Sequence, residues 1–447
     1  MHDKISFIQT AIQQGEFAKI REEIIQLNVV DIAQLLDELE EEQTLILFRL
    51  LPKEISAEVF SYISTEQQQF IIESITDKEI KNIIDNLFMD DTVDILEEMP
   101  ANVVKRILKQ VSSERRNLIN QFLRYPENSA GSLMTIEYID LKKEMTVDQA
   151  LKHIKKVGVD GETIDICYVM DQNRKLEGII PLRKLILNDG DTVIEEIMET
   201  SIISINTHMD QEEISNLFRK YDLLAMPVVD QENRLVGIIT IDDIIDIIEL
   251  ENTEDFHVMA AMEPSEEEYL KTSVARLARN RIVWLLILMV SATFTGGIIR
   301  KYDDILSSMV ALAVYIPMLM DSAGNSGSQS ATMIIRGLAL GEVSMKDMAK
   351  VAWKELRVGL IVGLTLASVN FTRIYFFDGV GVWVAATVSI SLLFTIILAK
   401  LVGGSLPIIA KKLRLDPAIM AGPLITTLVD AVALMIYFQL ASWLLNL

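Results

Sequence analysis

Cysteine and histidine are scarce in this sequence. Cys167 is the only cysteine among 447 residues, which excludes disulfide frameworks and thiolate metal sites and is compatible with a cytoplasmic location. The four histidines stand far apart, at His2, His153, His208 and His257, so no transition-metal cluster is expected. The polar start of the chain runs into an amphipathic segment and predicts no cleavable signal peptide.

Enzyme signatures are also lacking, and over residues 1–272 Lys and Arg are outnumbered by Asp and Glu. The sequence has no Walker loop, no Ser/His/Asp set and no metal-hydrolase motif, so it predicts no enzyme. Residues 1–272 carry a net charge of −29, whereas residues 273–447 carry +6. An acidic region repels nucleic-acid phosphates and attracts cations. We therefore expect divalent cations and no nucleic acid as partners, with ordinary solvation as the alternative explanation of the charge.

Glycine is nearly absent from the first 125 residues, where Gly15 stands alone and apolar residues recur at helical spacing. Two related segments punctuate this region: Leu51-Pro52 precedes Ser64-Thr65-Glu66, and Met99-Pro100 precedes Ser112-Ser113-Glu114. Proline, and Ser or Thr before Glu, are helix-start signals. The pattern predicts an all-α, superhelical N-terminal domain over residues 1–130, built from stacked helix pairs.

A second repeat follows, with the pattern strand, turn, strand, helix in each copy. Asp171-Gln172 with Gly178 reappears 59 residues later as Asp230-Gln231 with Gly237. The two copies resemble a tandem pair of cystathionine-beta-synthase (CBS) domains, an α/β unit over residues 131–250. In such domains a Thr and an Asp at the spacing of Thr240 and Asp243 hold a nucleotide ribose.

The first CBS copy has Pro181 and Lys184 at the positions of Thr240 and Asp243. It lacks both ribose-binding groups, so we expect at most one adenosine site per chain, for ATP at the second copy. A purely structural CBS pair remains the alternative.

Long apolar stretches occur only after residue 272. Ile282 to Ile299 is uncharged over 18 residues, which as a helix covers about 27 Å and so the hydrocarbon core of a bilayer. Four further stretches qualify, at about 305–335, 358–377, 380–398 and 418–445. The sequence therefore predicts a transmembrane domain of five helices over residues 273–447 in a multi-pass protein of the cell membrane.

The basic residues between these stretches predict the orientation. They precede the first span (Arg276, Arg279, Arg281), follow the second (Lys346, Lys350, Lys354, Arg357) and follow the fourth (Lys400, Lys411, Lys412, Arg414). Cytoplasmic loops carry an excess of Lys and Arg. The N-terminal domains are therefore expected in the cytoplasm and the C-terminus outside the cell.

Two features of the membrane half point to a hard cation. Asp430 lies near the middle of the last span, where a carboxylate facing lipid would be costly and where an ionisable residue is a functional candidate by default. The polar run from Pro317 to Gln329 interrupts the second span. Backbone released by Pro and Gly must line a cavity or be buried in protein, and its carbonyls would join the Asn325 and Gln329 amides as oxygen ligands. One acid with neutral oxygens suits Mg²⁺ better than Ca²⁺.

The segment Pro317 to Gln329 resembles the Pro-x6-Gly-Asn-x-Gly-x-Gln signature of the MgtE family of magnesium channels. Further similar segments are Gly131-Ser-Leu-Met-Thr135, Thr253-Glu-Asp-Phe-His257, Asp416-Pro417, Gly422-Pro423 and Thr426-Thr427 with Asp430. The resemblance implies a homodimer with one pore on its two-fold axis, where Asp430 meets its symmetry mate. It also implies that Asp321, Gly324 and Asn325 lie near the pore entrance or filter, and that residues 251–272 form a connecting plug helix.

The same resemblance implies that cytosolic Mg²⁺ closes the pore by binding acidic side chains and drawing the cytoplasmic domains together. Candidate ligands in the first domain share one helix, at Asp90, Asp91, Asp94 and Glu98. Their expected counterparts are Asp210, Glu212, Asp222, Asp243, Asp246, Glu251, Glu254 and Asp255. Asp91 and Asp94 stand three apart and so share a helix face. For each of these acids, a solvated surface position is the alternative.

Two other functions fit parts of the sequence. A carrier that couples cation movement to Na⁺ or H⁺ would need ionisable groups in the membrane besides Asp430, and Asp321 and Glu355 are the candidates. Glu355 is otherwise expected to form an interfacial ion pair. A membrane-anchored metal or nucleotide sensor that transports nothing would not need the polar run in the second span.

Overall fold

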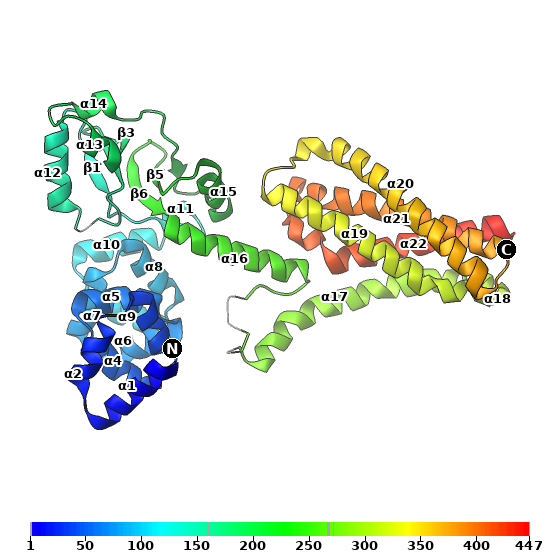
Figure 1. Ribbon diagram of the computed structural model, residues 1–447, viewed down its shortest axis with the longest axis horizontal. Coiled ribbons are helices and arrows are strands. Elements are labelled where there is room, and N and C mark those ends of the chain that lie inside the picture. Colours follow the sequence, from blue (N-terminus) through cyan, green and yellow to red (C-terminus); the bar gives the residue numbers. More distant parts are fainter. Residues whose placement is uncertain (1, 160, 266–268, 271, 447) are drawn as a thin grey trace. The chain divides into compact units, whose positions relative to one another are not determined.

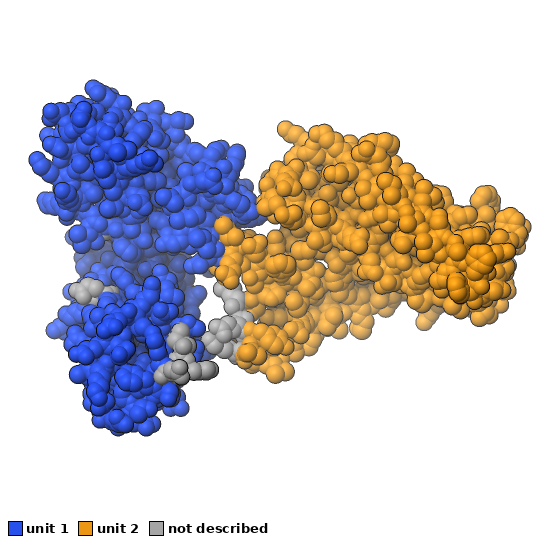
Figure 2. Space-filling model, viewed as in Figure 1, with its two compact units in different colours: residues 1–247 blue, residues 248–447 orange. Residues whose placement is uncertain are grey.

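The computed structural model describes residues 2–159, 161–265, 269–270 and 272–446. The chain forms two compact units, Met1–Ile247 and Ile248–Leu447, drawn in two colours in Figure 2. Each unit has apolar cores of its own.

The first unit begins with short, closely spaced helices (Figure 1). They are α1 His2–Gln14, α2 Phe17–Ile24, α3 Val29–Asp37, α4 Glu41–Leu50, α5 Lys53–Tyr62, α6 Thr65–Ser74, α7 Asp77–Asn86, α8 Met89–Glu98, α9 Ala101–Gln110 and α10 Ser113–Phe122. Alternate helices pack together, as α3 with α5, α5 with α7 and α7 with α9. This arrangement confirms the prediction of an all-α N-terminal domain.

The predicted helix-start signals lie where the sequence placed them. Pro52 and Pro100 immediately precede α5 and α9, and Ser64 and Ser112 precede α6 and α10. The Ser112 side chain accepts a hydrogen bond from the Arg115 backbone N–H at 3.2 Å, which satisfies a donor that the helix itself leaves unpaired.

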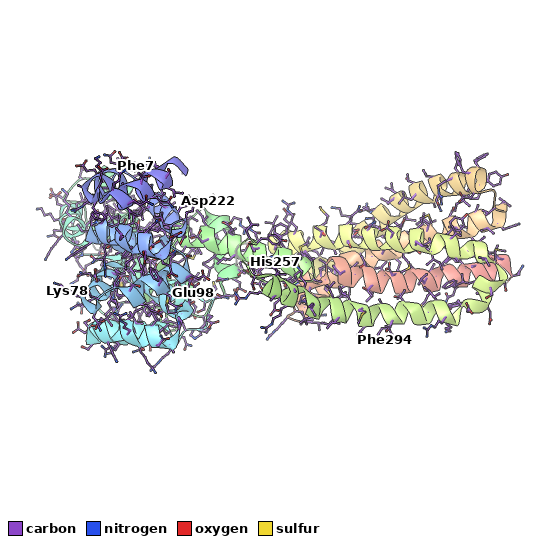
Figure 3. The ribbon with its side chains drawn as sticks, turned by 90° about the horizontal axis from the view of Figure 1, so that it is seen from below. Phe7, Lys78, Glu98, Asp222, His257 and Phe294 are labelled. Atoms are coloured by element: carbon purple, nitrogen blue, oxygen red, sulfur yellow. The ribbon has the colours of Figure 1, made fainter. Side chains whose placement is uncertain are left out.

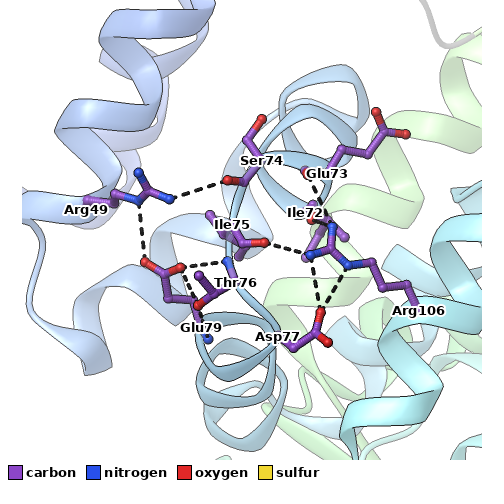
Figure 4. Close-up of polar contacts among 9 residues, drawn as sticks. All are labelled: Arg49, Ile72, Glu73, Ser74, Ile75, Thr76, Asp77, Glu79 and Arg106. Carbon is purple, nitrogen blue, oxygen red and sulfur yellow. Dashed lines mark hydrogen bonds and ion pairs between the residues drawn. The ribbon is translucent and has the colours of Figure 1, made fainter.

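Arginine side chains fasten the turns between these helices (Figure 4). From α9, Arg106 donates to the carbonyl oxygens of Ile72 at 2.6 Å and Ile75 at 2.7 Å, and it contacts Asp77 at 3.2 Å. From α4, Arg49 donates to the Ser74 carbonyl at 3.3 Å. The carbonyls at the end of α6 would otherwise lack partners, so these contacts fix α4 and α9 to the turn between α6 and α7.

The rest of the first unit contains two copies of a small α/β module. The first comprises β1 Ile139–Leu141, α12 Val147–Val157, β2 Ile166–Met170, β3 Leu176–Pro181 and α13 Leu182–Leu187; the second comprises β4 Ile205–Asn206, α15 Gln211–Tyr221, β5 Ala225–Val229, β6 Leu235–Thr240 and α16 Ile241–Met259. Short helices α11 Ala130–Leu133 and α14 Ile194–Ile197 accompany them. Each sheet pairs its first two strands in parallel and its last two as an antiparallel hairpin.

The two hairpin turns have the same chemistry, as the repeat predicted. Asp171 Oδ1 accepts from the N–H groups of Asn173 and Lys175, and Asp230 Oδ1 accepts from those of Glu232 and Arg234, all at 2.7–2.8 Å. The turns also meet, since the Leu176 N–H donates to the Asn233 carbonyl and the Leu235 N–H to the Arg174 carbonyl. The copies are therefore related by a local two-fold arrangement.

Helix α16 differs from the predicted plug. We expected the second module to end near residue 250 and a separate helix to span residues 251–272, but α16 continues without a break to Met259. Among the described residues between 260 and 273 none is helical, and residues 266–268 and 271 of the expected plug lie outside the described residues. The run of residues from Ile241 onward contains neither Gly nor Pro that would end the helix earlier.

The second unit is a bundle of long helices with short connecting helices. They are α17 Val274–Lys301, α18 Asp303–Ser308, η1 Val310–Tyr315, α19 Ile316–Ala339, η2 Met345–Asp347, α20 Met348–Arg373, η3 Ile374–Asp378, α21 Val382–Lys412, η4 Pro417–Met420 and α22 Gly422–Leu445. In the described part of the chain, α17, α20 with its flanking turns, α21 and α22 are long and apolar enough to cross a membrane. The expected fifth span remains a prediction and corresponds to the more polar α19.

Two details of the membrane half correct the sequence-based predictions. The run from Pro317 to Gln329 does not break a helix, because it lies inside α19 with Pro317 in the first turn, where no backbone donor is needed. The irregular backbone instead precedes it, in η1. Lys400 is not a loop residue: α21 extends to Lys412, and Lys400 is buried at 4% exposure. The loop after α21 still contains Arg414.

Candidate functional site

The membrane candidate site is centred on Asp430, two turns into α22. Its Oδ1 atom is buried and has no hydrogen-bond partner among the described residues. Asp321, on α19, is exposed but near enough for the two carboxylates to interact electrostatically. Two like charges with an unpartnered buried oxygen form an arrangement that a cation would stabilise.

Helix α19 presents two polar faces. Asp321, Asn325 and Gln329 are exposed and follow one another at intervals of four residues, so they form one stripe of oxygen-bearing side chains. Ser326 and Ser330 are buried and form a second stripe. The carbonyls of the helix are used by its own hydrogen bonds, so side chains rather than released carbonyls are the ligands that this segment offers.

Glycines let three helices approach closely at this site. A Cβ atom at Gly324 would lie 2.8 Å from Thr426 Cγ2 on α22, and one at Gly327 would lie 2.8 Å from Ile425 Cγ2. A Cβ atom at Gly403 on α21 would collide with the Gly327 carbonyl oxygen. The glycines therefore hold α19 between α21 and α22 at a separation that no larger residue allows.

The start of α22 is built from the motif residues that precede Asp430. Pro423 occupies the first turn, and its carbonyl accepts hydrogen bonds from both Thr426 and Thr427 at 2.8 Å. Asp416 caps the preceding short helix through the Ala418 N–H at 2.7 Å. These motif residues therefore position the helix that carries Asp430.

A cavity of about 370 Å³ lies beside Asp430 between α17 and α22. Its lining residues are Ser291, Phe294, Thr295, Leu424, Thr427, Leu428, Ala431 and Val432. Phe294 is 70% exposed and is labelled on the outer side of α17 in Figure 3. The lining is largely apolar and contains no charged side chain, so this cavity offers a cation few ligands.

The second candidate site is an acidic interface within the first unit, between α8 and the start of α16. Asp90 is buried at 8% exposure, and burial followed by repulsion from Asp243 raises the pKa of Asp90 well above its usual range. Burial, and then Asp243, also raise the pKa of Asp94 to about 7. Asp90 and Asp94 of α8 thus lie close enough to Asp243 for repulsion, and among the described residues neither forms an ion pair with Lys or Arg.

The other acids of this interface are perturbed in the same direction. Burial and then Asp242 raise the pKa of Asp243 to about 7, and burial with repulsion from Asp242 and Glu137 raises the pKa of Asp91 to about 6. Asp246 lies close to Tyr62, whose pKa is raised by burial and then by Asp91, Asp242 and Asp246. Carboxyls crowded in this way retain protons in place of counterions.

Sequence reasoning missed Glu162 as a member of this interface. Burial and then Asp243 raise the pKa of Glu162 to about 8, and its Oε2 atom is buried without a hydrogen-bond partner. Glu137 also belongs here and accepts from Thr135 at 2.6 Å. Glu137 lies in the loop before β1 and Glu162 in the loop between α12 and β2, so no helical spacing marked them, and only the fold brings them to α8.

The remaining acidic candidates are placed elsewhere. Glu98 accepts from Thr65 at the start of α6. Asp210, Glu212 and Asp222 belong to α15: Asp210 caps its first turn through the Glu212 N–H at 2.9 Å, and Asp222 follows its last turn with φ of 51°. Figure 3 labels Glu98 and Asp222 on their separate elements. Glu251, Glu254 and Asp255 lie on the second half of α16.

The described part of the chain does not supply a complete direct metal site. In the described ranges, no group of three or more His, Cys, Asp or Glu side chains is arranged to hold a metal ion. Mg²⁺ keeps several of its waters and binds through one or two carboxylates. The acidic interface, with only oxygen donors and the orphaned Glu162 Oε2, therefore suits a hydrated Mg²⁺ better than a dehydrated ion.

The candidate ribose-binding residues are close together at the end of β6. Thr240 is buried at 5% exposure and its hydroxyl donates to Asp243 Oδ2 at 2.9 Å. Asp243 stands in the first turn of the 19-residue helix α16, where the helix dipole favours negative groups. The same carboxylate also faces Asp90 and Asp94, so a ribose hydroxyl and a cation would compete for it or share it.

Known protein families match the N-terminal helical domain, the second CBS module and the membrane region of this chain. Family models match residues 316–440 as a divalent cation transporter, 27–128 as the MgtE intracellular N domain and 194–250 as a CBS domain. The family is thus one of transporters rather than enzymes. Among solved structures, the soluble part of a magnesium transporter is 30% identical, with a TM-score of 0.53 over 56% of this chain and 99% of that chain.

A crystal structure of the cytosolic domain of the Mg²⁺ channel MgtE in complex with ATP is 35% identical, with a TM-score of 0.52 over 54% of this chain and 99% of that chain. Magnesium transporter MgtE of Bacillus subtilis is 32% identical over 92% of this chain and 93% of that protein. Magnesium transporter MgtE of Thermus thermophilus is 36% identical over 100% of both chains. The chain therefore belongs to the MgtE family, with an N-terminal helical domain, a CBS pair and a helical membrane region.

Proposed function

We propose that this protein transports Mg²⁺ across the cell membrane and that cytosolic Mg²⁺ closes it. The observation that carries the proposal is the unpartnered Asp430 carboxylate on an apolar helix, next to Asp321 and the polar stripe of α19. A carboxylate kept in the membrane without a protein partner is stabilised by water or a cation. Membership of a family of divalent cation transporters supports the same conclusion.

The transporting form is a homodimer with five spans per chain. Within the described ranges, four helices meet the length and hydropathy needed to cross a bilayer, and α19, with 24 residues, would reach about 36 Å and form the fifth. Five spans put the N-terminal domains in the cytoplasm and the C-terminus outside. A two-fold axis beside Asp430 would pair the carboxylates of both chains, which gives a dication two counter-charges from one acid per chain.

Each domain has its own role in this proposal. Residues 1–130 and the CBS pair, 131–250, form the acidic sensor. Residues 251–272 connect the sensor to the membrane domain as the plug, and residues 273–447 form the ion pathway. Asp430, Asp321, Gly324 and Asn325 line that pathway. The regulatory ligands are Asp90, Asp91, Asp94, Glu98, Asp210, Glu212, Asp222, Asp243, Asp246, Glu251, Glu254 and Asp255, with Glu162 added from the structure.

Charge explains how cytosolic Mg²⁺ would close the pathway. At neutral pH the acids of α8 and α16 repel one another or hold protons. Hydrated Mg²⁺ between them replaces that repulsion with attraction and stabilises the compact arrangement. Without Mg²⁺, ionised acids would push α8 away from the CBS pair, which is the open state of this proposal.

ATP is the proposed ligand of the second CBS copy. Thr240 and Asp243 lie together at a helix start, joined by a hydrogen bond, which supports a role in holding a ribose, and a related cytosolic domain has been crystallised with ATP. Because Asp243 also faces α8, ATP would change the Mg²⁺ sensitivity of the sensor. Calorimetry on the full chain that detects no heat of ATP binding would contradict this part alone.

Flux into proteoliposomes tests the function. The full chain is reconstituted, and Mg²⁺ entry is followed with a trapped Mg²⁺ dye, with and without Mg²⁺ on the side of the N-terminal domains. We expect entry that is fast without cytosolic-side Mg²⁺ and slow with it, and no entry in protein-free vesicles. Absence of entry under both conditions would favour a sensor that transports nothing, and entry that requires a Na⁺ or H⁺ gradient would favour a coupled carrier.

A further inference from the structure

A second polar centre lies in the membrane bundle, away from Asp430. Lys400 is in the middle of α21 and only 4% exposed. Its charged group has left water, and an isolated ammonium in an apolar bundle is strongly unfavourable unless an opposite charge and hydrogen bonds accompany it. The group that supplies the opposite charge is Glu355, which reaches the same place from α20.

Ser330 on α19 joins the two charges. Its hydroxyl donates to Glu355 Oε2 at 2.6 Å and accepts from Lys400 Nζ at 3.4 Å. One hydroxyl is able to do both, because it has one proton to donate and lone pairs to accept with. The short contact to the carboxylate is of the strong, charge-assisted kind. Ser330 therefore connects three helices through one side chain.

The neighbouring residues leave room for this contact. A Cβ atom at Gly404, four residues after Lys400 on α21, would lie 2.8 Å from Glu355 Cγ. Ser326, one turn before Ser330, is buried, and its hydroxyl has no hydrogen-bond partner. Glycine at 404 lets the Glu355 side chain pass α21, and the two serines give the buried face of α19 its polar character.

The position of Ser330 on α19 links this centre to the proposed pathway. The buried stripe of Ser326 and Ser330 and the exposed stripe of Asp321 and Asn325 belong to one helix. A helix is stiff over two turns, so a shift or rotation of α19 at Ser330 moves Asp321 and Asn325 by a similar amount. Packing alone allows such sliding, since the residues opposite Gly324 and Gly327 are methyl groups and a backbone carbonyl.

We propose that Glu355 and Lys400, joined through Ser330, are positioning residues that fix the register of α19 and so place Asp321 and Asn325 for Mg²⁺. The inference rests on the proposed function, because it assigns these three residues a role in that transport. None of them touches the ion. The pair acts through geometry: a directional contact between charges resists sliding, whereas apolar contact does not.

Transport kinetics of charge-removing variants in the full chain test the proposal. Flux is measured per folded, monodisperse protein over a range of external Mg²⁺ concentrations for Glu355→Gln, Lys400→Met and the two combined. Each single variant leaves a buried charge unbalanced, so we expect half-maximal flux to need about tenfold more Mg²⁺. The combined variant removes both charges and is expected to recover to within about threefold of the original protein. Lys412→Met, an exposed change on the same helix, is the control.

Ser330→Ala keeps both charges and covers the case in which the single variants do not fold. It removes the hydroxyl that joins the helices, and we expect about a threefold rise in the Mg²⁺ concentration of half-maximal flux, with Ser330→Thr closer to the original. A purely structural role would reduce the yield of folded protein and leave this concentration unchanged in every variant, which would overturn the inference. Absence of flux from the unaltered protein would instead overturn the proposed function.

Discussion

Acidic side chains are treated in opposite ways in the two units. In the first unit, Asp90, Asp94 and Asp243 crowd together, and burial with mutual repulsion raises their pKa values. In the membrane bundle, some buried or half-buried charges are matched, as Glu355 is with Lys400 through Ser330 and Asp378 is with Arg373 at 3.6 Å. Asp430 is not matched in this way, because its buried Oδ1 atom has no hydrogen-bond partner among the described residues.

The acidic interface between α8 and α16 therefore suits a regulatory switch, and the membrane bundle suits an ion pathway. A cluster of acids without counter-charges responds strongly to cations, because one bound cation removes much of the repulsive energy between the carboxylates. In the membrane bundle, Asp321 and Asp430 stand on the packed helices α19 and α22, so their carboxylates would meet a passing ion at a fixed place. Changes to the first unit should therefore alter the Mg²⁺ dependence of closure, and changes to the bundle should alter flux itself.

The largest expected effect comes from removing the negative charge of Asp430. Asp430→Asn should lower maximal Mg²⁺ flux by about 100-fold, since contacts to a charged group are worth about 1.5–3 kcal/mol each and a dimer would lose two. Flux into proteoliposomes measures it. Glu342→Gln, an exposed acid after α19, is the matched control. Unchanged flux in Asp430→Asn would remove Asp430 from the pathway.

The rigidity of the bundle is tested at its closest helix crossing. Gly403→Ala places a methyl group against the Gly327 carbonyl, so α19 and α21 must separate, and overpacking of this kind costs about 1–3 kcal/mol. We expect a lower unfolding temperature in detergent and reduced flux. Gly297→Ala on α17, where a Cβ atom meets nothing within 4 Å, is the control. Equal stability of the two variants would show that the crossing tolerates movement.

Neutralising acids of the interface between α8 and α16 should leave the maximal Mg²⁺ flux unchanged. Asp91→Asn with Asp94→Asn removes two of the acids that face α16, and we expect closure to need about 30-fold more cytosolic-side Mg²⁺, because each of the two lost charged contacts costs about 1 kcal/mol. The measurement is flux against cytosolic-side Mg²⁺ concentration. Asp85→Asn, an exposed acid on α7, should change nothing. A fall in maximal flux would instead contradict the assignment of regulation to the first unit and of transport to the membrane bundle.

The smallest expected effect is a pH dependence of the first unit without metal. The pKa values of Asp94 and Asp243 are raised to about 7 and that of Glu162 to about 8 in the compact state. A raised pKa in the folded state gives stability that is present at low pH and lost as the pH rises through the folded value. Without Mg²⁺, the unfolding temperature of this unit should therefore fall between about pH 6 and pH 8.

Mg²⁺ is expected to reverse that trend, because it stabilises the ionised acids. Scanning calorimetry of the full chain at several pH values, with and without Mg²⁺, resolves the effect. Glu162→Gln should flatten the metal-free dependence near pH 8, while Asp171→Asn, a change in a hairpin turn outside the interface, should not. A metal-free stability that rises with pH would contradict the assigned burial of these carboxyls.

Sequence reasoning was most successful where chemistry is local. Helix starts at Pro52, Pro100 and Ser112, and the twin turns at Asp171 and Asp230, follow from residue type and spacing alone. These features depend on contacts within a few residues of each other. Thr240 and Asp243, three residues apart, also form one local hydrogen bond, and their role in ribose binding stays a prediction.

Several features that the sequence does not reveal depend on contacts across the fold. The sequence predicts an interruption of the second span at Pro317, whereas the helix begins at Ile316 and uses the proline in its first turn. It also places Lys400 with the loop cations, because the partners Ser330 and Glu355 are 70 and 45 positions away. Glu162 has no regular spacing to mark it. For Lys400 and Glu162, the contacts that decide the structure come from distant segments.

The acidic interface has a further consequence in terms of ion exchange. Carboxyls with raised pKa values carry protons near neutral pH, so a hydrated Mg²⁺ that enters the proposed sensor must displace protons into the cytoplasm. The interface then behaves as a weak-acid ion exchanger whose occupancy follows the ratio of Mg²⁺ to H⁺ and not the Mg²⁺ concentration alone. A cell that acidifies its cytoplasm would thereby raise the Mg²⁺ level at which metal fills the interface.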